Sequence, residues 1–337
     1  MNYRNALVIT SIAAPNEALK KYAIESAKHK VHYIVIGDSK SPKDFDLRGC
    51  DFYSIERQKQ LPYSICKILP EKKYSRKNIG YLVAMENGHN VISETDDDNF
   101  PRSGFWKPSK IKTDCYYIEN HGWLNVYAYF TDQKIWPRAF PLEHVNDEVP
   151  DIKKFSYREV TCPVQQGLAD ENPDVDAIFR LVKILPINFK RSPSVGLGNK
   201  TCCPFNSQNT RWFKPAFPLM YLPSYCSFRM TDIWRSFVAQ RIFWENDWTL
   251  LFHKATVYQK RNDHNILHDF RDEISGYLNN NIILETLDNL KLKGGLLYLQ
   301  DNLKKCYEAL IKIKLIEEKE MELLEAWCND INTVVTY

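Results

Sequence analysis

The sequence predicts an α/β fold with a mostly parallel central sheet, followed by a C-terminal helical region. Three observations lead to this prediction. An apolar run at residues 6–10 is followed by a helical pattern and by a second apolar run at residues 32–36. A further apolar run at residues 90–95 ends in adjacent aspartates, and from about residue 265 the pattern becomes long and helical. Strand, helix and strand in this order open a right-handed βαβ unit, which requires parallel strands.

The first βαβ unit indicates where a ligand would bind. Its helix begins near Pro15 and carries apolar residues at helical spacing. Ligands of such sheets bind beyond the carboxyl ends of the strands, where Thr10, Ser11 and Asp38 stand in this sequence. No GxGxxG motif follows the first strand, so a mononucleotide is favoured over a dinucleotide.

The next helix and strand lead to the most informative motif of the chain. Residues 76–85 have helical apolar spacing and begin with two basic residues, Arg76 and Lys77. The turn at residues 87–89 precedes a strand over residues 90–95, which runs directly into three aspartates.

Asp96, Asp97 and Asp98 predict a divalent metal site at the edge of the sheet. Carboxylate oxygens suit Mg²⁺ or Mn²⁺, whose remaining positions are usually filled by water and substrate phosphates. In an extended segment Asp96 and Asp98 would face the same way and share one ion, while Asp97 would point elsewhere, toward a donor sugar. The alternative is a solvated acidic turn that caps the next element.

Two later residues have both a functional and a structural interpretation. His253 follows an apolar strand-like run and would complete the metal shell, although a lone histidine beside such a run is more often a hydrogen-bonded structural residue. Asp232 precedes an apolar helical stretch, where it is either a general base or a helix cap together with Thr231. Spacing alone does not separate these alternatives.

The C-terminal part is predicted to contain two or three amphipathic helices, broken near Gly294-Gly295 and once earlier. We therefore divide the chain into residues 1–264 and residues 265–337. The second region is expected to pack on the first or to mediate homo-oligomerisation. Coiled-coil pairing is less favoured, because the heptad pattern does not persist.

Composition limits the possible partners and compartments. The 337 residues include 45 basic and 42 acidic side chains, a net charge of +3 that argues against a protein that coats nucleic acid. Nine scattered cysteines without a CxxC pair indicate reduced thiols in a cytosol-like compartment. The short N-terminal apolar run does not fit a signal peptide, and no stretch reaches the roughly 18 apolar residues of a membrane span. We expect a cytoplasmic protein, with peripheral membrane contact left open.

Several segments together resemble the STELLO glycosyltransferases. The resemblance covers roughly residues 5–265 and is specific, because many uncommon short motifs occur in the same order. Residues 173–181 are also similar to the reversibly glycosylated polypeptides, the plant UDP-arabinopyranose mutases. The motifs that carry the resemblance are PYS (62–64), RKNIGY (76–81), ETDDDN (94–99), IWPR (135–138), PL (141–142), QGL (166–168), PDVDAIFRL (173–181), NSQNT (206–210) and TDIWR (231–235).

The resemblance implies a GT-A-like nucleotide-sugar-binding fold and a metal-dependent glycosyltransferase. The family's DxD motif falls on Asp96 and Asp98, the acceptor-activating acid on Asp232, and a third metal ligand on His253. The plant proteins are membrane-anchored in the Golgi, so their location and acceptor do not carry over to this chain.

The expected ligands are Mn²⁺ or Mg²⁺, a nucleotide diphosphate sugar, most simply a UDP-sugar, and a glycan or glycoconjugate acceptor. Two alternatives stay open: a UDP-sugar mutase or self-glycosylating protein, and a non-catalytic scaffold of glycan synthesis. For the nucleotide we predict Thr10, Ser11, Asp38, Arg76 and Lys77, and for the donor sugar, phosphate or acceptor we predict Asp97, Arg138, Asn206, Gln208 and Arg229.

Overall fold

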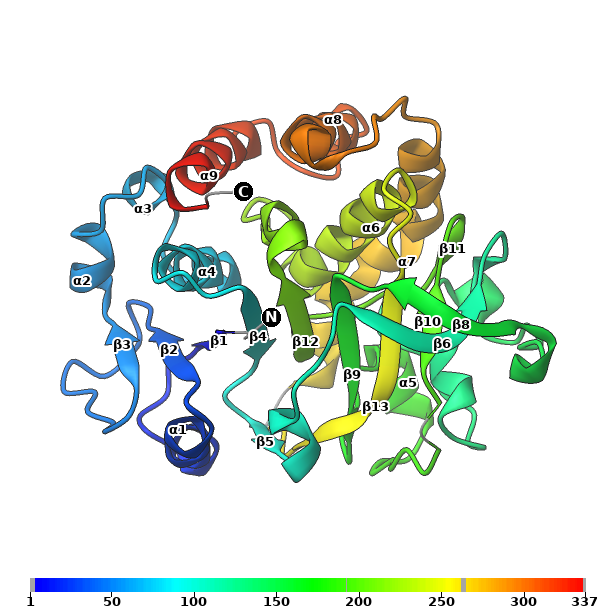
Figure 1. The fold of residues 1–337 in the computed structure, drawn as a ribbon, viewed down its shortest axis with the longest axis horizontal. Helices are drawn as coiled ribbons and strands as arrows, with labels where there is room; N and C mark the ends of the chain where they lie inside the picture. The colour runs from blue at the N-terminus through cyan, green and yellow to red at the C-terminus, as the bar shows by residue number, and fades with distance from the viewer. Residues whose placement is uncertain (1–3, 192, 262–264, 336–337) are drawn as a thin grey trace.

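A computed structural model describes residues 4–191, 193–261 and 265–335. An 11-stranded sheet crosses the molecule in the order β3-β2-β1-β4-β12-β9-β13-β10-β6-β8, and β5 pairs with β13 beside this path (Figure 1). A separate two-stranded sheet pairs β11 with β7. The strands are β1 (Asn5–Thr10), β2 (His32–Ile36), β3 (Asp51–Tyr53), β4 (Val91–Thr95), β5 (Asn99–Pro101), β6 (Lys112–Ile118), β7 (Gly122–Trp123), β8 (Ser156–Thr161), β9 (Val164–Asp170), β10 (Val195–Leu197), β11 (Thr201–Cys202), β12 (Asn209–Phe213) and β13 (Leu250–Gln259).

The N-terminal half of the sheet is parallel throughout, whereas the other half combines the parallel pairs β9–β13 and β6–β10 with antiparallel ones. β1 pairs in parallel with both β2 and β4, and β2 pairs in parallel with β3, which confirms the predicted βαβ opening. Beyond β4 the sheet is mixed, because β12 runs antiparallel to both β4 and β9. A parallel pair needs a long crossover, usually a helix, and among the described residues between β4 and β12 the one α-helix is the short α5 (Ala177–Val182). The prediction of a mostly parallel sheet therefore holds for the first half only.

Helices cover both faces of the sheet. α1 (Glu17–His29) lies on one face, and α4 (Lys77–Glu86) and α6 (Thr231–Trp244) lie on the other (Figure 1). Successive side chains of a strand point to opposite faces, so β1 serves two cores at once. Leu7 and Ile9 pack with Tyr22 of α1, whereas Val8 belongs to the large core that contains Ile79 of α4. The remaining helices are α2 (Ile55–Lys59), α3 (Ile65–Ile68), α7 (Ile266–Asp288), α8 (Leu299–Lys312) and α9 (Glu320–Val334).

Gly80 sets the distance between α4 and the sheet. A Cβ atom at this position would lie 2.5 Å from Cγ1 of Val8 and 2.9 Å from Cγ1 of Ile36. Only glycine lets α4 approach β1 and β2 this closely. The approach brings Lys77, in the first turn of α4, beneath the end of β4.

The C-terminal helices belong to the main core. Leu303 of α8 and Trp327 of α9 are buried in the same cluster as Val8, so these helices share the core of the sheet domain. Three helices form, as predicted, with one interruption at Gly294-Gly295. The second interruption was misplaced: α7 is continuous and the break lies at residues 313–319, after α8, where Lys314 has a φ of +61°.

Buried carboxylates of α9 anchor it to earlier parts of the chain. Glu320 accepts hydrogen bonds from the backbone N–H groups of Ser224 and Tyr225, at 3.0 and 2.6 Å. Asp330 accepts from the N–H groups of Ser64 and Ile65 at the start of α3. All nine cysteines are free thiols. Across the described residues, the helices include none with the length and apolar character that crossing a membrane requires.

Candidate active site

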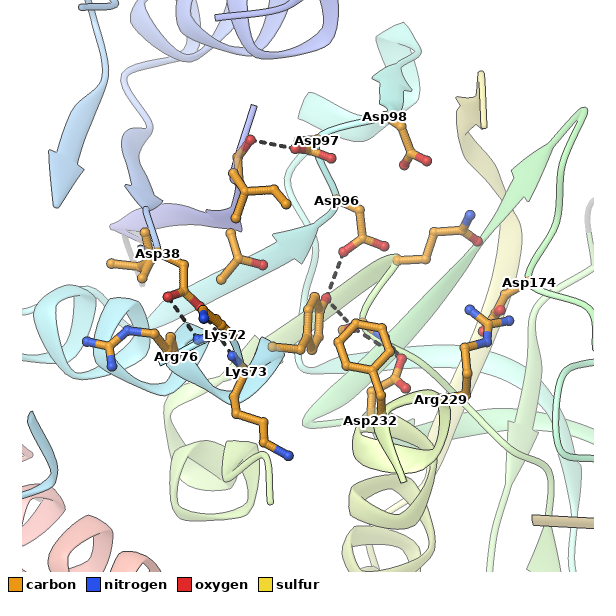
Figure 2. A pocket seen from close by; sticks show the side chains of 18 of the residues that line it. Asp38, Lys72, Lys73, Arg76, Asp96, Asp97, Asp98, Asp174, Arg229 and Asp232 are labelled. Atoms are coloured by element: carbon orange, nitrogen blue, oxygen red, sulfur yellow. Dashed lines mark hydrogen bonds between the residues drawn. The ribbon is translucent and has the colours of Figure 1, made fainter. Parts of the chain in front are cut away.

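A cavity of about 490 Å³ opens at the carboxyl ends of β1, β2 and β4. This is the edge of the sheet at which the sequence predicts a ligand. Asp96 lies between Asp38 on one side of the cavity and Asp174 and Arg229 on the other (Figure 2). Most of the predicted site residues line it: Thr10, Ser11, Asp38, Arg76, Asp96, Asp97, Asp98, Arg138, Gln208, Arg229 and Asp232.

The three adjacent aspartates point to three different partners. Asp96 accepts a hydrogen bond from the Tyr74 hydroxyl at 2.7 Å. Asp97 accepts one from the Ser11 hydroxyl at 2.5 Å, as Figure 2 shows, and both carboxylate oxygens of Asp98 accept from Nε2 of Gln259 at 3.0 and 2.9 Å.

The premise that this segment is extended is wrong. β4 ends at Thr95, and the N–H of Asn99 bonds to the carbonyl of Asp96 across a turn. The turn, and not strand alternation, therefore sets the directions of the three carboxylates.

The surroundings of these three carboxylates disfavour their charged form. Burial raises the pKa of Asp96, Asp97 and Asp98 above the usual range for aspartate. For Asp98, burial and the neighbouring charges of Asp96 and Asp97, opposed by the Gln259 hydrogen bond, raise the pKa to about 7. A bound cation would offset this repulsion. Nowhere in the described ranges do three metal-binding side chains converge, so an ion here would take its remaining ligands from substrate and water.

Lys77 lies beneath the cavity, whereas Arg76 is among the residues that line it. The side chain of Lys77 is wholly buried and donates to the Tyr74 hydroxyl at 2.6 Å and to the carbonyl of Thr95 at 2.8 Å. It does not line the cavity. The guanidinium of Arg76 binds Gln58 and the carbonyl of Leu69, which holds the loop before α4. Both residues were predicted to contact the nucleotide, and both are placed to support the site.

Asp38 organises a basic loop. Its carboxylate accepts hydrogen bonds from the backbone N–H groups of Lys72 and Lys73, at 2.9 and 3.2 Å (Figure 2). Both lysines line the cavity, as does Lys40. Sequence reasoning missed the lysine pair, because the segment before the helix carries no motif and its proximity to Asp38 depends on the tertiary fold.

The opposite wall is a chain of ion pairs. Arg138 binds Asp174 through two hydrogen bonds, at 2.8 and 2.9 Å, and its Nη2 is 3.0 Å from both carboxylate oxygens of Asp232. Arg229 pairs with Glu273 of α7 at 2.8 Å. A C-terminal helix thus fixes part of the site wall, which the division of the chain at residue 264 did not anticipate.

Asp232 lies in the first turn of α6, but its side chain does not cap that helix. It accepts hydrogen bonds from the N–H and the hydroxyl of Ser207, both at 3.1 Å. Burial alone would raise the pKa of Asp232, but the Arg138 and Arg235 guanidinium groups and the Ser207 N–H together hold it below its usual value. The carboxylate is therefore ionised at neutral pH.

Arg180 is a further cationic group that the sequence did not single out. It belongs to α5 and to the motif PDVDAIFRL, and it lines the cavity. Its guanidinium donates hydrogen bonds to the side-chain oxygen of Asn172 and to the carbonyl of Pro173. Its Nε is buried without a hydrogen-bond partner. Burial, followed by the nearby Arg261, lowers the pKa of Arg180 to about 9. A buried guanidinium with spare donors is suited to an anionic ligand.

Two predicted residues lie elsewhere. Asn206 is buried in a turn, where its Oδ1 accepts from the N–H of Gln208 at 3.0 Å, and it does not line the cavity. His253 lies inside β13 and lines a second cavity. His253 was expected to be a third metal ligand. Its ring instead packs over Gly167, in the middle of the sheet and away from the aspartates that follow β4.

Comparisons with known proteins give one consistent result. A family model described as STELLO glycosyltransferases matches residues 229–336, which extends the likeness into the C-terminal helices. The chain is similar to the "Probable glycosyltransferase STELLO1" of Arabidopsis thaliana, 31% identical over 255 residues, with 68% of this chain and 33% of that protein covered. It is 27% identical over 327 residues to the "Probable glycosyltransferase STELLO2" of the same plant, with 88% and 41% covered. The chain thus spans between a third and about two fifths of the length of these relatives.

Proposed function

This chain belongs to the STELLO-like family, and on that premise we propose that it is a metal-dependent glycosyltransferase. The proposed reaction transfers a sugar from a nucleotide diphosphate sugar, most simply a UDP-sugar, to a glycan or glycoconjugate acceptor. One observation carries the proposal: a single cavity at the ends of parallel strands combines three adjacent carboxylates, a lysine-bearing loop and a separate ionised aspartate.

We assign the fold to the GT-A-like class. The support is the parallel order β3-β2-β1-β4 with carboxylates directly after β4, followed by a mixed half that carries the opposite wall. In such an arrangement the nucleotide would lie over the ends of β1 and β2, near Thr10, Ser11 and Asp38.

The metal in this proposal is Mn²⁺ or Mg²⁺, held by Asp96 and Asp98. The residues fit such an ion: Asp98 is buried, Asp96 is partly buried, and both are carboxylates of raised pKa that line the cavity. A divalent ion would neutralise the diphosphate leaving group. Asp97 is tied to Ser11, so we assign it to shaping the end of β1 and not to the ion.

The remaining roles follow from charge. Lys72 and Lys73 would contact the phosphates from the loop that Asp38 holds. Asp232 would accept the proton of the acceptor hydroxyl, which must then replace Ser207 as its hydrogen-bond donor. Because the pKa of Asp232 is low, Arg138 would have to loosen its contact as the proton arrives.

Calorimetry with UDP and Mn²⁺ tests the metal and nucleotide assignments. Asp96→Ala and Asp98→Ala should each lose metal-dependent binding of UDP, while Asp46→Ala, which removes an exposed carboxylate elsewhere, should bind as the parent does. Equal binding by all three variants would refute the metal role.

Product analysis separates transfer from its alternatives. Incubation with a UDP-sugar alone should yield neither an isomeric sugar nor labelled protein, since either product would identify a mutase or a self-glycosylating protein. A scaffold would release no UDP with any donor and acceptor.

A further inference from the structure

A second cavity, of about 460 Å³, shares no lining residue with the first. It lies against the middle of the sheet, between β12, β13 and the segment that follows β5. A bulge in β13 between His253 and Val257 shifts the register there. Bulges re-aim side chains locally and often occur beside functional sites.

The lining of this second cavity is cationic. Arg211, Lys107, Lys110 and Lys254 contribute to it, and none of the described residues that line it is acidic. The guanidinium of Arg211 binds the carbonyls of Phe105 and Lys107, at 2.8 and 3.0 Å, and the hydroxyls of Ser93 and Ser109. All four partners are neutral oxygens. Burial lowers the pKa of Arg211 to about 10, because no carboxylate there offsets the cost of burying its charge.

Uncharged polar groups complete the cavity. Thr113, Ser194, Thr256 and Gln165, which carry hydroxyl or amide groups, line it together with His253. Such groups match the hydroxyls of a sugar, while the basic groups match an oxyanion.

We propose that the second cavity binds a saccharide that carries a phosphate or carboxylate group. The assignment is independent of the proposed transferase activity, because it uses none of the residues of the first cavity. The oxyanion would lie against Arg211, with Lys107 and Lys254 at the rim and the sugar along the hydroxyls.

Calorimetry on the full chain in EDTA tests this site, with glucose 6-phosphate, glucose and inorganic phosphate as probes. Glucose 6-phosphate should bind more tightly than phosphate, and glucose should not bind. Lys107→Ser/Lys254→Ser, which changes only exposed lysines, should weaken glucose 6-phosphate binding about tenfold. The matched double variant Lys72→Ser/Lys73→Ser, at the first cavity, should bind it as the parent does.

Three results would overturn the proposal: no binding by the parent, a loss only in the Lys72→Ser/Lys73→Ser variant, or equal affinities for phosphate and glucose 6-phosphate. The exposed lysines are chosen because their replacement leaves the hydrogen bonds between the Arg211 guanidinium and residues 105–109 intact. A loss of binding therefore cannot be attributed to unfolding, and unchanged melting temperatures check this.

A different observation supports a second inference. The outer face of α7 carries exposed apolar residues at Ile274, Leu278 and Ile282, with Leu278 70% exposed. Leu181, Val182 and Ile184, at and just after the end of α5, are also exposed, and α5 packs against α7. Contiguous exposed apolar surface of this kind marks an interaction site.

The charges on this face are arranged symmetrically about Leu278. Ile274 and Ile282 lie four residues before and after it, and the exposed Arg271 and Glu285 lie seven residues before and after it. If two α7 helices pack antiparallel about Leu278, each Ile274 meets Ile282 of the partner subunit, and each Arg271 meets Glu285 of the partner subunit. A two-fold interface requires this kind of self-complementarity.

We infer that a second copy of this chain covers the outer face of α7 in an antiparallel dimer. Sedimentation over a concentration series should give a dimer for the parent. Arg271→Glu and Glu285→Arg should each weaken it about tenfold through like-charge contact, and the combined variant should restore it. Leu278→Glu should give a monomer, whereas Leu297→Glu, at an equally apolar site that is 93% exposed and lies off this face, should leave the dimer intact. A monomeric parent, or a combined variant as weak as the single ones, would overturn the inference.

Discussion

The ammonium group of Lys77 lies 3.4 Å from a carboxylate oxygen of Asp96, and the lysine side chain is wholly buried. The same ammonium holds the Thr95 carbonyl, so one cation fixes both the end of β4 and the first aspartate after it. The turn that bears the three carboxylates thus rests on a charge supplied from α4.

Replacing Lys77 with methionine should weaken metal binding although no predicted ligand is removed. Asp96 would lose the ammonium group that lies 3.4 Å from its carboxylate, so its pKa should rise further and its proton should compete with the metal. Supporting residues of this kind typically change metal affinity by about 10–100-fold. Calorimetry with Mn²⁺ and UDP measures the effect, and Lys20→Met, at an exposed site on α1, serves as the control. Unchanged affinity would show that Lys77 serves only the fold.

The stability of the metal-free protein should depend on Asp98 near neutral pH. The pKa of Asp98 is raised to about 7 in the folded state, mainly by burial, so the folded state holds the proton more tightly than the unfolded chain. Its contribution to stability is complete below the unfolded pKa of about 4 and is lost as the pH rises through about 7.

Metal binding should show the opposite trend. Mn²⁺ must displace the proton, so the rise in melting temperature that it causes should grow between about pH 5.5 and pH 8. Thermal melts with and without Mn²⁺ measure this, and Asp98→Asn should flatten the pH dependence. A metal effect that is independent of pH in the parent would contradict the assignment.

Asp232→Asn should retain donor binding and lose transfer. Asparagine keeps the shape and can still bond to Ser207, but it cannot accept a proton from an acceptor hydroxyl. The loss of turnover should be on the order of 10²–10⁴-fold, the usual contribution of a general base. Binding of UDP and Mn²⁺ checks that the site is intact. Full turnover would remove Asp232 from the reaction.

Arg235→Met should destabilise the fold without touching the cavity directly. Arg235 donates to both carboxylate oxygens of Glu94, at 2.8 and 3.1 Å, and both side chains are fully buried. Removing one member leaves a buried charge, which typically costs about 3–5 kcal/mol. Urea unfolding measures the loss, and Glu94→Gln/Arg235→Met should recover part of it. If the double variant is less stable than Arg235→Met alone, the stranded charge is not the cause.

The sequence predicts the helices and strands whose formation depends on residues that are close together in the chain. The strands at β1, β2 and β4, the helix α1 and the helical character of the C-terminal region follow from periodicity, although the break between α8 and α9 was not predicted. The aspartates after β4 were located for the same reason, since a strand end and its following turn are encoded within a few residues.

Contacts between distant segments could not be inferred in this way. Lys72 and Lys73 reach the cavity because Asp38 binds their backbone, and His253 misses it because β13 places the ring against Gly167. Both outcomes depend on which strands are neighbours in the sheet, and no local pattern specifies that order.

The sequence by itself determined that Asp96, Asp97 and Asp98 stand at the end of a buried strand, because apolar periodicity and the aspartates are adjacent in the chain. Only the tertiary structure decided what each carboxylate meets. Ser11, Gln259 and Lys77 come from three different elements, and the turn after β4 directs one aspartate toward each of them. Hydrogen bonding, which requires the assembled fold, therefore separates the two proposed metal ligands from the aspartate between them.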